Sequence, residues 1–156
     1  MKWTLKTFNE LSTYELYQIL MLRNSVFVVE QQCAYQEIDG NDLNSFHLSF
    51  GDGEQLAAYA RLLPAGVKYN TPSIGRIIVH ESFRGSGIAR ELVSKSIDVM
   101  QNEWNVSEIK LQAQTYLRHF YQSFGFEETS EDYLDDGIPH VDMLMKVKQP
   151  ISKGSE

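Results

Sequence analysis

The sequence has little cysteine and a deficit of basic charge. Cys33 is the single cysteine among 156 residues, which excludes an internal disulfide and a zinc site built from several cysteines and indicates a reducing compartment. Lys and Arg total 14 against 21 Asp and Glu, a formal net charge of -7. Because that sign repels nucleic acid phosphates and anionic lipid, we expect neither nucleic acid nor membrane as a partner.

Membrane and export signals are also lacking. Residues 1–4 show no basic-then-apolar run of a signal peptide, and no stretch approaches the roughly 18 uninterrupted apolar residues that indicate a membrane-spanning helix. We therefore predict a cytoplasmic protein. A chain that is 42% hydrophobic and 12% aromatic is long enough for one sizeable core and too short for two. This predicts one domain over residues 1–148 and a frayed tail over 149–156.

Hydrophobic periodicity predicts nine elements in the order β, α, β, β, β, α, β, α, β. The predicted strands cover residues 3–8, 45–50, 56–63, 74–79, 109–114 and 141–147. The first helix begins after Ser12, with Glu15 as its capping-box partner, and runs to about residue 26. A second helix of about four turns follows Gly87, and a short third helix covers 117–124. The order predicts an α/β fold, in which helices flank a mixed, mostly antiparallel sheet.

The most informative segment is Arg84-Gly85-Ser86-Gly87-Ile88-Ala89, between a predicted strand and a predicted helix. Small residues leave backbone N–H groups unobstructed, and a helix start adds unpaired donors and positive dipole potential. Together these features can hold a phosphate or pyrophosphate. From Arg84 to Lys95 there are three cations and one anion, so the local charge has the sign that a phosphate requires.

Three phosphate-binding patterns compete for this segment. A dinucleotide fingerprint needs Gly or Ala where Arg90 stands, and a P-loop needs Gly-Lys-Ser/Thr, which the sequence lacks. The third pattern, Arg/Gln-x-x-Gly-x-Gly/Ala shortly after a strand, fits Arg84, Gly87 and Ala89, with Val79 ending the strand. A glycine-rich turn that only leads into a helix is the structural alternative.

This segment resembles the pyrophosphate loop of the GNAT superfamily of N-acetyltransferases. Residues 114–126 are similar to that family's strand, helix and Gly-Phe ending. Within the superfamily, the sequence most resembles the ElaA-like branch, on four blocks: 22–31, 33–40, 58–61 and 136–140. The resemblance implies a GNAT-like acyltransferase fold, acetyl-coenzyme A as cosubstrate, no metal, and a monomer or homodimer.

The resemblance also implies roles for individual residues. Tyr121 falls where family members often carry the tyrosine that protonates the departing thiolate, although packing beneath a helix is its structural alternative. Gln114 falls where many members carry an asparagine that contacts the pantetheine arm. The backbone of residues 77–79 would face that arm, with the Val79 N–H donating to the oxyanion. The implied donor-binding residues are Ile77, Ile78, Val79, Arg84, Gly85, Ser86, Gly87, Ile88, Ala89, Gln114 and Tyr121.

The general base is not specified by the sequence. The attacking amine must be neutral, and His47, His140 or a water held by Glu37 or Asp39 could take its proton. Cys33 lacks cationic neighbours in the sequence, so a structural role is the stronger reading for its thiol.

Two acidic stretches could bear on the acceptor. Glu30, Glu37, Asp39 and Asp42 place four carboxylates in 13 residues, which would attract a cationic amine, with a solvated acidic loop as the alternative. Six acids over residues 127–136 are interpreted as a solvated face. The candidate substrate-binding residues are Arg23, Glu30, Glu37, Asp39, His47 and His140.

These features predict an N-acetyltransferase that moves an acetyl group from acetyl-coenzyme A to a primary amine of a small molecule or protein. Attack would be direct, with no covalent enzyme intermediate. One alternative is an acyl-homoserine-lactone synthase, because Arg23, the Glu37-x-Asp39 spacing and Arg61 resemble that family's amino-terminal half. The loop at 84–89 is absent from that family's pattern. Another alternative is an acyl-coenzyme A binding module without catalysis.

Overall fold

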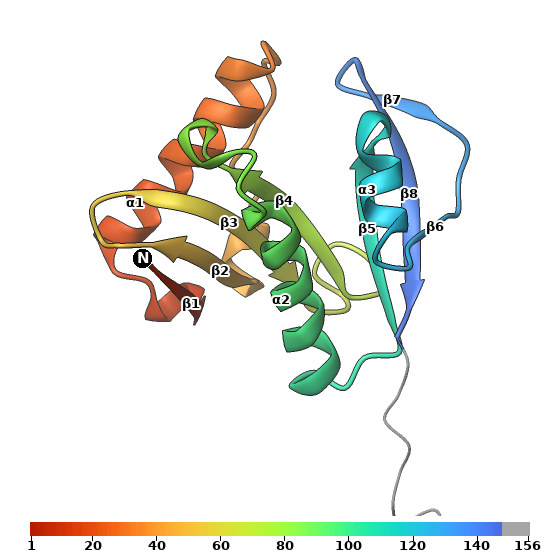
Figure 1. The fold of residues 1–156 in the computed structure, drawn as a ribbon, viewed down its shortest axis with the longest axis horizontal. Helices are drawn as coiled ribbons and strands as arrows, with labels where there is room; N and C mark the ends of the chain where they lie inside the picture. The colour runs from red at the N-terminus through yellow and green to blue at the C-terminus, as the bar shows by residue number, and fades with distance from the viewer. Residues whose placement is uncertain (148–156) are drawn as a thin grey trace, which may run out of the picture.

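A computed structural model describes residues 1–147, and the predicted tail over 149–156 lies outside the described residues. Eight strands form one sheet in the order β1-β2-β3-β4-β5-β8-β6, with β7 also paired to β8 (Figure 1). The strands are β1 (Lys2–Thr7), β2 (Phe46–Gly51), β3 (Leu56–Leu63), β4 (Ser73–Val79), β5 (Glu108–Gln114), β6 (Glu127–Glu128), β7 (Tyr133–Asp135) and β8 (Ile138–Lys146). All pairs are antiparallel except β4 with β5.

Three α-helices accompany the sheet: α1 (Thr13–Arg23), α2 (Ile88–Asn102) and α3 (Arg118–Gln122). The Ser12 side chain accepts from the Glu15 N–H, and the Glu15 carboxylate accepts from the Ser12 N–H, which confirms the predicted capping box. The 3-10 turns are η1 (Phe8–Glu10), η3 (Asn41–Asn44), η4 (Glu81–Phe83) and η5 (Thr115–Leu117). None of the helices within residues 1–147 combines the length and apolarity needed to cross a bilayer.

The first helix changes its winding before it ends. Beyond Arg23 it continues as a π-helix, η2 (Asn24–Glu30). The N–H of Cys33 donates to the Val28 carbonyl at 3.0 Å, five residues back, instead of four. Such wide turns are rare and occur mostly at functional sites. The prediction of a helix to about residue 26 is thus correct in position, but it did not include the change from α-helical to π-helical winding after Arg23.

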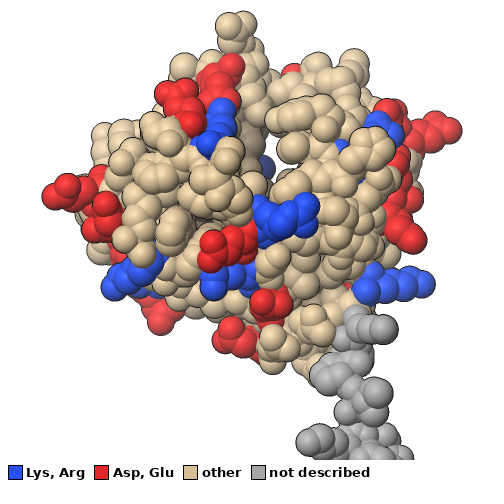
Figure 2. Space-filling view, viewed as in Figure 1, with Lys and Arg blue, Asp and Glu red and all other residues tan. Residues whose placement is uncertain are grey.

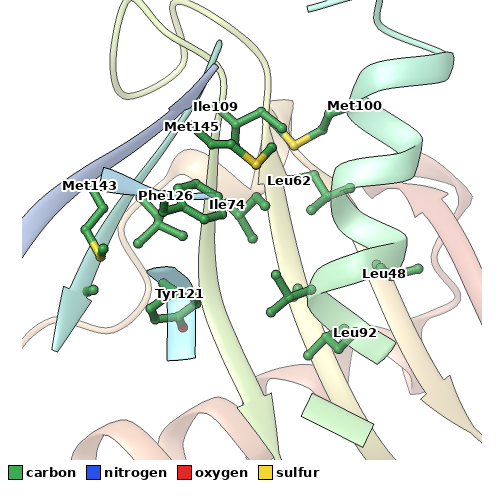
Figure 3. Packing of buried hydrophobic residues seen from close by; sticks show 14 of the residues in the cluster. Leu48, Leu62, Ile74, Leu92, Met100, Ile109, Tyr121, Phe126, Met143 and Met145 are labelled. Atoms are coloured by element: carbon green, nitrogen blue, oxygen red, sulfur yellow. The ribbon is translucent and has the colours of Figure 1, made fainter. Parts of the chain in front are cut away.

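The two faces of the sheet carry different helices. Successive residues of a strand point to opposite faces, so Tyr59 faces α1 while Ala58 and Ala60 face α2. On the α1 side, Ile19, Leu22 and Val26 pack against Tyr59 and Ile78. On the α2 side a larger cluster runs from Leu48 and Leu92 through Met100 to Phe126, Met143 and Met145 (Figure 3).

The parallel pair β4 and β5 is joined only at its start. Ser73 pairs with Lys110, and the register includes no later pair among the described residues. The strands separate beyond that point (Figure 1). In addition, β4 contains a bulge, because the register shifts between Tyr59 and Arg61 and Arg76 has a φ of +51°. Separation and bulge together open the middle of the sheet.

The predicted element order is confirmed for all nine elements. The structure adds β6 and β7, which are two and three residues long and carry no apolar periodicity. The predicted helix over 117–124 is shorter than expected, since a 3-10 turn precedes α3. These differences concern the segment that follows β5, at one wall of the opening.

Candidate active site

The glycine turn reaches α2 through two residues with left-handed backbone. Gly85 has a φ of +83° and Gly87, the N-cap, a φ of +86°. Gly87 has no side chain to cap the helix, and the first helical bond runs from the Glu91 N–H to the Gly87 carbonyl at 3.2 Å. The N–H groups of residues 88–90 therefore have no acceptor within the helix. They can hold a phosphate at the positive end of the α2 dipole.

The arginines beside this turn have protein partners. Arg84 donates from Nε to the Val79 carbonyl at 2.9 Å, and its terminal nitrogens bind both Glu30 carboxylate oxygens at 3.0 and 3.1 Å. Arg90 lies over the Phe124 ring, 4.8 Å from its centroid. The Arg84 and Glu30 side chains are each 43% exposed. Because an exposed ion pair is weak, Arg84 can exchange Glu30 for a phosphate.

A cavity of about 360 Å³ lies between the separated strands. Figure 2 shows this hollow between the two halves of the molecule, with basic side chains over the start of α2 at its lower edge. Nine predicted site residues line it: Glu30, Ile77, Ile78, Val79, Arg84, Ala89, Gln114, Tyr121 and His140. Gly85, Ser86, Gly87 and Ile88 lie in the turn between the lining residues Arg84 and Ala89. Thus the cavity opens beside the glycine turn.

The wall formed by β4 offers a backbone donor to this cavity. The His80 N–H donates to the Ala57 carbonyl at 2.8 Å, which makes that pair hydrogen-bonded in the antiparallel ladder. The adjacent pair, Ala58 with Val79, is therefore a non-hydrogen-bonded pair, in which the backbone N–H and C=O groups point away from the partner strand. The Val79 N–H consequently faces the space between β4 and β5, where an extended ligand or an oxyanion could accept from it.

Tyr121, on α3, reaches the cavity from the opposite wall. Its side chain is 5% exposed and packs edge-on against Phe120 and Phe126, with ring centroids 5.2 and 6.2 Å away. Figure 3 shows it at the edge of the buried cluster. Burial raises the pKa of the Tyr121 hydroxyl well above its usual value. The hydroxyl therefore stays protonated at neutral pH and can act as a proton donor.

His140 lines the cavity beside Gln114, its partner across β5 and β8. The His140 Nδ1 lies 2.7 Å from the Ile138 carbonyl oxygen. Since a carbonyl can only accept, Nδ1 carries the hydrogen, and Nε2 of the neutral ring is free to accept a proton. The ring also stacks on Tyr133, with centroids 6.3 Å apart. These contacts fix both the tautomer and the orientation of a candidate base.

Three acids of the first stretch, Glu37, Asp39 and Asp42, do not line the cavity and are paired with arginines, whereas Glu30 lines it. Arg23 binds Glu37 and Asp42, both at 2.7 Å, and its side chain is fully buried. Arg61 binds Asp39 and Asp42 at 2.9 Å. We call these three carboxylates and the arginines Arg23, Arg61 and Arg76 the buried ion network. Glu37 and Asp42 therefore neutralise arginines in the interior, and Asp39 does so while remaining partly exposed to solvent.

The pKa values in this network follow the arginines. Burial would raise the pKa of Asp42, but hydrogen bonds and charge from Arg23 and Arg61 hold it below its usual value. The pKa of Asp39 is likewise lowered against the effect of burial, chiefly by hydrogen bonds from Arg61. Both groups remain charged at neutral pH and stabilise the fold only while their partners are present.

His47 is buried, 1% exposed, and does not line the cavity. Its Nε2 faces the Asp42 carbonyl at 3.0 Å and its Nδ1 the Tyr59 hydroxyl at 2.6 Å. Burial lowers its pKa, so the ring is held neutral. With both nitrogens engaged, His47 cannot take a proton from an acceptor. Arg23, Glu37 and Asp39 likewise do not line the cavity, so the structure does not bring these candidates together with Glu30 and His140.

The second acidic stretch divides into two parts. Arg118 binds Glu128 at 3.0 Å and Asp132 at 2.7 Å on the surface, which agrees with a solvated face. Asp135 and Asp136 instead line the cavity, and Asp135 accepts from the Gln112 side chain at 3.0 Å. Asp136 is nonetheless exposed, as expected for a solvated face, whereas Asp135 is half-buried, because β7 folds back along β8.

The cavity also contains residues that sequence reasoning did not assign to it. Cys33 lines it and donates to the Asp136 carbonyl at 3.4 Å. The other additional lining residues include Phe27, Gln31, Tyr35, Arg76, Gln112, Tyr116 and Ile138. Phe27 and Gln31 lie in the 22–31 block, Cys33 and Tyr35 in the 33–40 block and Ile138 in the 136–140 block, so the family resemblance was the sequence signal for these five. Within residues 1–147 no group of three or more His, Cys, Asp or Glu side chains is arranged to hold a metal.

Known proteins match this chain along most of its length. The acetyltransferase (GNAT) domain family matches residues 10–147. Protein ElaA of Escherichia coli is 43% identical over 143 residues, which are 90% of this chain and 94% of that protein. The crystal structure of E. coli ElaA matches with a TM-score of 0.87 at 41% identity, covering 93% of this chain and 99% of that one.

Two further solved structures show how widely the fold is shared. An acyl-CoA N-acyltransferase from Pseudomonas aeruginosa matches with a TM-score of 0.87 at 37% identity, covering 93% of this chain and 99% of that one. BjaI, a CoA-dependent acyl-homoserine lactone synthase solved with SAM and isopentyl-CoA, reaches a TM-score of 0.74 at 13% identity over 94% of this chain and 82% of its own. The likeness to BjaI is one of fold alone. These matches confirm the predicted family: the chain belongs to the GNAT acetyltransferase family, in its ElaA-like branch, and this family uses acyl-coenzyme A as acyl donor.

Proposed function

We propose that this protein is an N-acetyltransferase that transfers the acetyl group of acetyl-coenzyme A to a primary amine. The observation that carries the proposal is one cavity, lined by the β4 edge, Tyr121 and His140, that opens beside the glycine turn of α2. The turn supplies free N–H donors for the pyrophosphate. The separated β4 edge supplies a place for the pantetheine arm.

The residues of the cavity fit direct transfer. The neutral amine attacks the thioester carbonyl, forming a C–N bond, while the Val79 N–H stabilises the oxyanion. His140 Nε2 takes the proton that the amine nitrogen loses. When the C–S bond breaks, the Tyr121 hydroxyl protonates the sulfur. The proton gained by His140 balances the one given by Tyr121, so the amide and free coenzyme A form without net proton uptake.

Replacement of Tyr121 tests this assignment of roles. We expect Tyr121→Phe to lower kcat for amine-dependent thiol release by about 100-fold, the usual range for one general acid, with little change in coenzyme A affinity. Tyr116→Phe is the matched control, because Tyr116 also lines the cavity but is 76% exposed. The assay uses acetyl-coenzyme A with a panel of amines and detects the released thiol.

Three results would count against the proposal. No amine-dependent release by the wild type across the panel, with coenzyme A bound, would make the protein a binding module. Equal kcat for Tyr121→Phe and wild type at saturating donor would remove Tyr121 from the chemistry. An equal loss in Tyr116→Phe would indicate that the cavity surface, and not the buried acid, sets the rate.

A further inference from the structure

A second hollow of about 820 Å³ runs along α1 and η2. Its other wall is formed by the turn between β2 and β3 and by the start of η4. We call it the α1 groove. Its lining residues are Gln18, Met21, Leu22, Ser25, Val26, Val29, Glu30, Asp52, Glu54, Gln55, Leu56, His80 and Glu81.

The groove combines an apolar floor with an acidic rim. Met21 is 57% exposed and Val29 65% exposed, so two large apolar side chains face solvent there. Four carboxylates line the groove and no Lys or Arg of the described residues does. Glu30 has the Arg84 partner described above, whereas neither Glu54 nor Glu81 makes an ion pair within residues 1–147. The surface therefore favours a ligand that is cationic and partly apolar.

The length of the groove favours an extended chain over a compact ligand. Along the helical wall the lining residues run from Gln18 to Val29 at spacings of three and four. At about 1.5 Å per residue this wall is roughly 15 Å long. An extended peptide of about five residues has the same length. Its alternate side chains could enter the floor while the others meet the acidic rim.

The groove adjoins the candidate active site. Val26 and Glu30 line both hollows, so a segment lying in the groove ends next to the cavity that contains Tyr121 and His140. We propose that the α1 groove binds a cationic, partly apolar polypeptide segment, whose amine is the acceptor. This inference rests on the proposed function, because it names the class of acceptor for the same cavity.

Peptide binding tests the groove independently of catalysis. The probe is an eight-residue peptide of alternating Lys and Leu with a free amino end and a fluorescent label at its carboxyl end. We expect it to bind the full chain, measured by fluorescence anisotropy at low salt, at least tenfold more tightly than the same peptide with Glu in place of Lys. Added salt should weaken the binding, because exposed charges are screened.

Charge reversal locates the binding surface. The double variant Glu54→Lys with Glu81→Lys should bind the Lys-Leu peptide at least tenfold more weakly than the wild type does. Asp98→Lys with Glu103→Lys, two exposed acids on or beside α2 that line neither hollow, makes the same change in net charge and should stay within twofold of wild type. Thiol release with small amines should be unchanged in both, since neither variant alters the cavity.

The outcomes separate this inference from the proposed function. Equal affinity for the two peptides, or for wild type and the Glu54/Glu81 variant, would overturn the groove assignment even if small amines are acetylated. Selective binding of the Lys-Leu peptide without acetylation of any amine would support peptide binding in the groove and overturn the proposed acetyltransferase function. Self-association of the wild type that the Glu54/Glu81 variant abolishes would assign the groove to a second copy of this chain and overturn the proposal.

Discussion

Two segments of this chain carry clustered charges of opposite sign, and the structure pairs one of them internally and leaves the other open to a ligand. The basic segment from Arg84 to Lys95 leads into α2 at the surface, where backbone donors of the first turn lack helical acceptors. The acidic segment from Glu37 to Asp42 lies behind the cavity wall, where each carboxylate binds buried or half-buried arginines. The first segment remains available to a ligand, and the second holds the fold together.

The difference shows that a charge cluster predicts a binding site only when the fold leaves it unpaired. The acids from 37 to 42 gain their partners from α1, β3 and the bulge of β4, 14 to 39 residues away. The glycine turn needs no distant partner, because its donors follow from the local chain geometry. Substitutions in either segment can therefore test this difference.

The largest effect is expected at the buried ion network. Arg23→Ala removes one arginine from Glu37 and Asp42 and should lower the free energy of unfolding by about 3–5 kcal/mol, because it leaves buried charge uncompensated. Denaturant unfolding measures the change. Arg118→Ala breaks two surface ion pairs and should have a far smaller effect. Similar losses in the two variants would contradict the structural role assigned to the network.

The next effect concerns the glycine turn. Gly87→Val places a branched side chain at a φ of +86° and should weaken coenzyme A binding at least tenfold, because the turn must change its backbone to relieve the strain. Gly66→Val is the matched control, with a φ of +91° and equally open space but no place in the cavity. Isothermal titration should find unchanged affinity in the control. Unchanged affinity in Gly87→Val would refute the loop assignment.

A smaller effect is expected from His47. Its pKa is lowered in the folded state. At a pH just below the usual histidine pKa, the unfolded chain therefore binds a proton at His47 that the folded protein does not bind. Stability should therefore fall as pH drops below about 6.5, the usual histidine value, by at most about 1.4 kcal/mol per pH unit. His47→Gln should flatten this slope between pH 6.5 and 5.5, whereas His119→Gln, at an exposed residue on α3, should not. A slope unaffected by His47→Gln would contradict the burial argument.

The smallest effect concerns the exposed pair at the mouth of the cavity. Glu30→Gln releases Arg84 from its carboxylate partner and should strengthen coenzyme A binding about threefold, an effect of the size expected for an exposed ion pair. Glu81→Gln removes a nearby acid without freeing an arginine and should change the affinity less. Titration calorimetry at two salt concentrations measures both. Weaker binding in Glu30→Gln would mean that Glu30 positions Arg84 instead of competing for it.

Local patterns let the sequence predict much of this molecule. Alternation and helical spacing predicted the element order, and Ser12 with Glu15 predicted a helix start. The spacing of Arg84, Gly87 and Ala89 predicted the turn, and the resemblance of this loop and of the other blocks indicated the family. These signals are contained in short windows, so tertiary context does not alter them. β6 and β7 were missed because short strands with exposed acids have no apolar periodicity.

The pairing of side chains could not be predicted in the same way. Nothing near Asp39 indicates that Arg61 will bind it, and nothing near Asp135 indicates that β7 will return it to the cavity. The π-helical winding of η2 was equally hidden, because its residues continue an ordinary helical apolar face. His47 lies in a predicted strand and His140 directly before one, and only the cavity distinguishes their roles.

The central claim, that the turn entering α2 binds the donor while the acidic segment only supports the fold, can be tested in one titration. Backbone amide resonances of the ¹⁵N-labelled protein are followed as coenzyme A is added. We predict large shifts for residues 85–89 and for Val79, and small shifts for the Glu37 to Asp42 segment. Large shifts confined to that acidic segment, with residues 85–89 unmoved, would contradict the account.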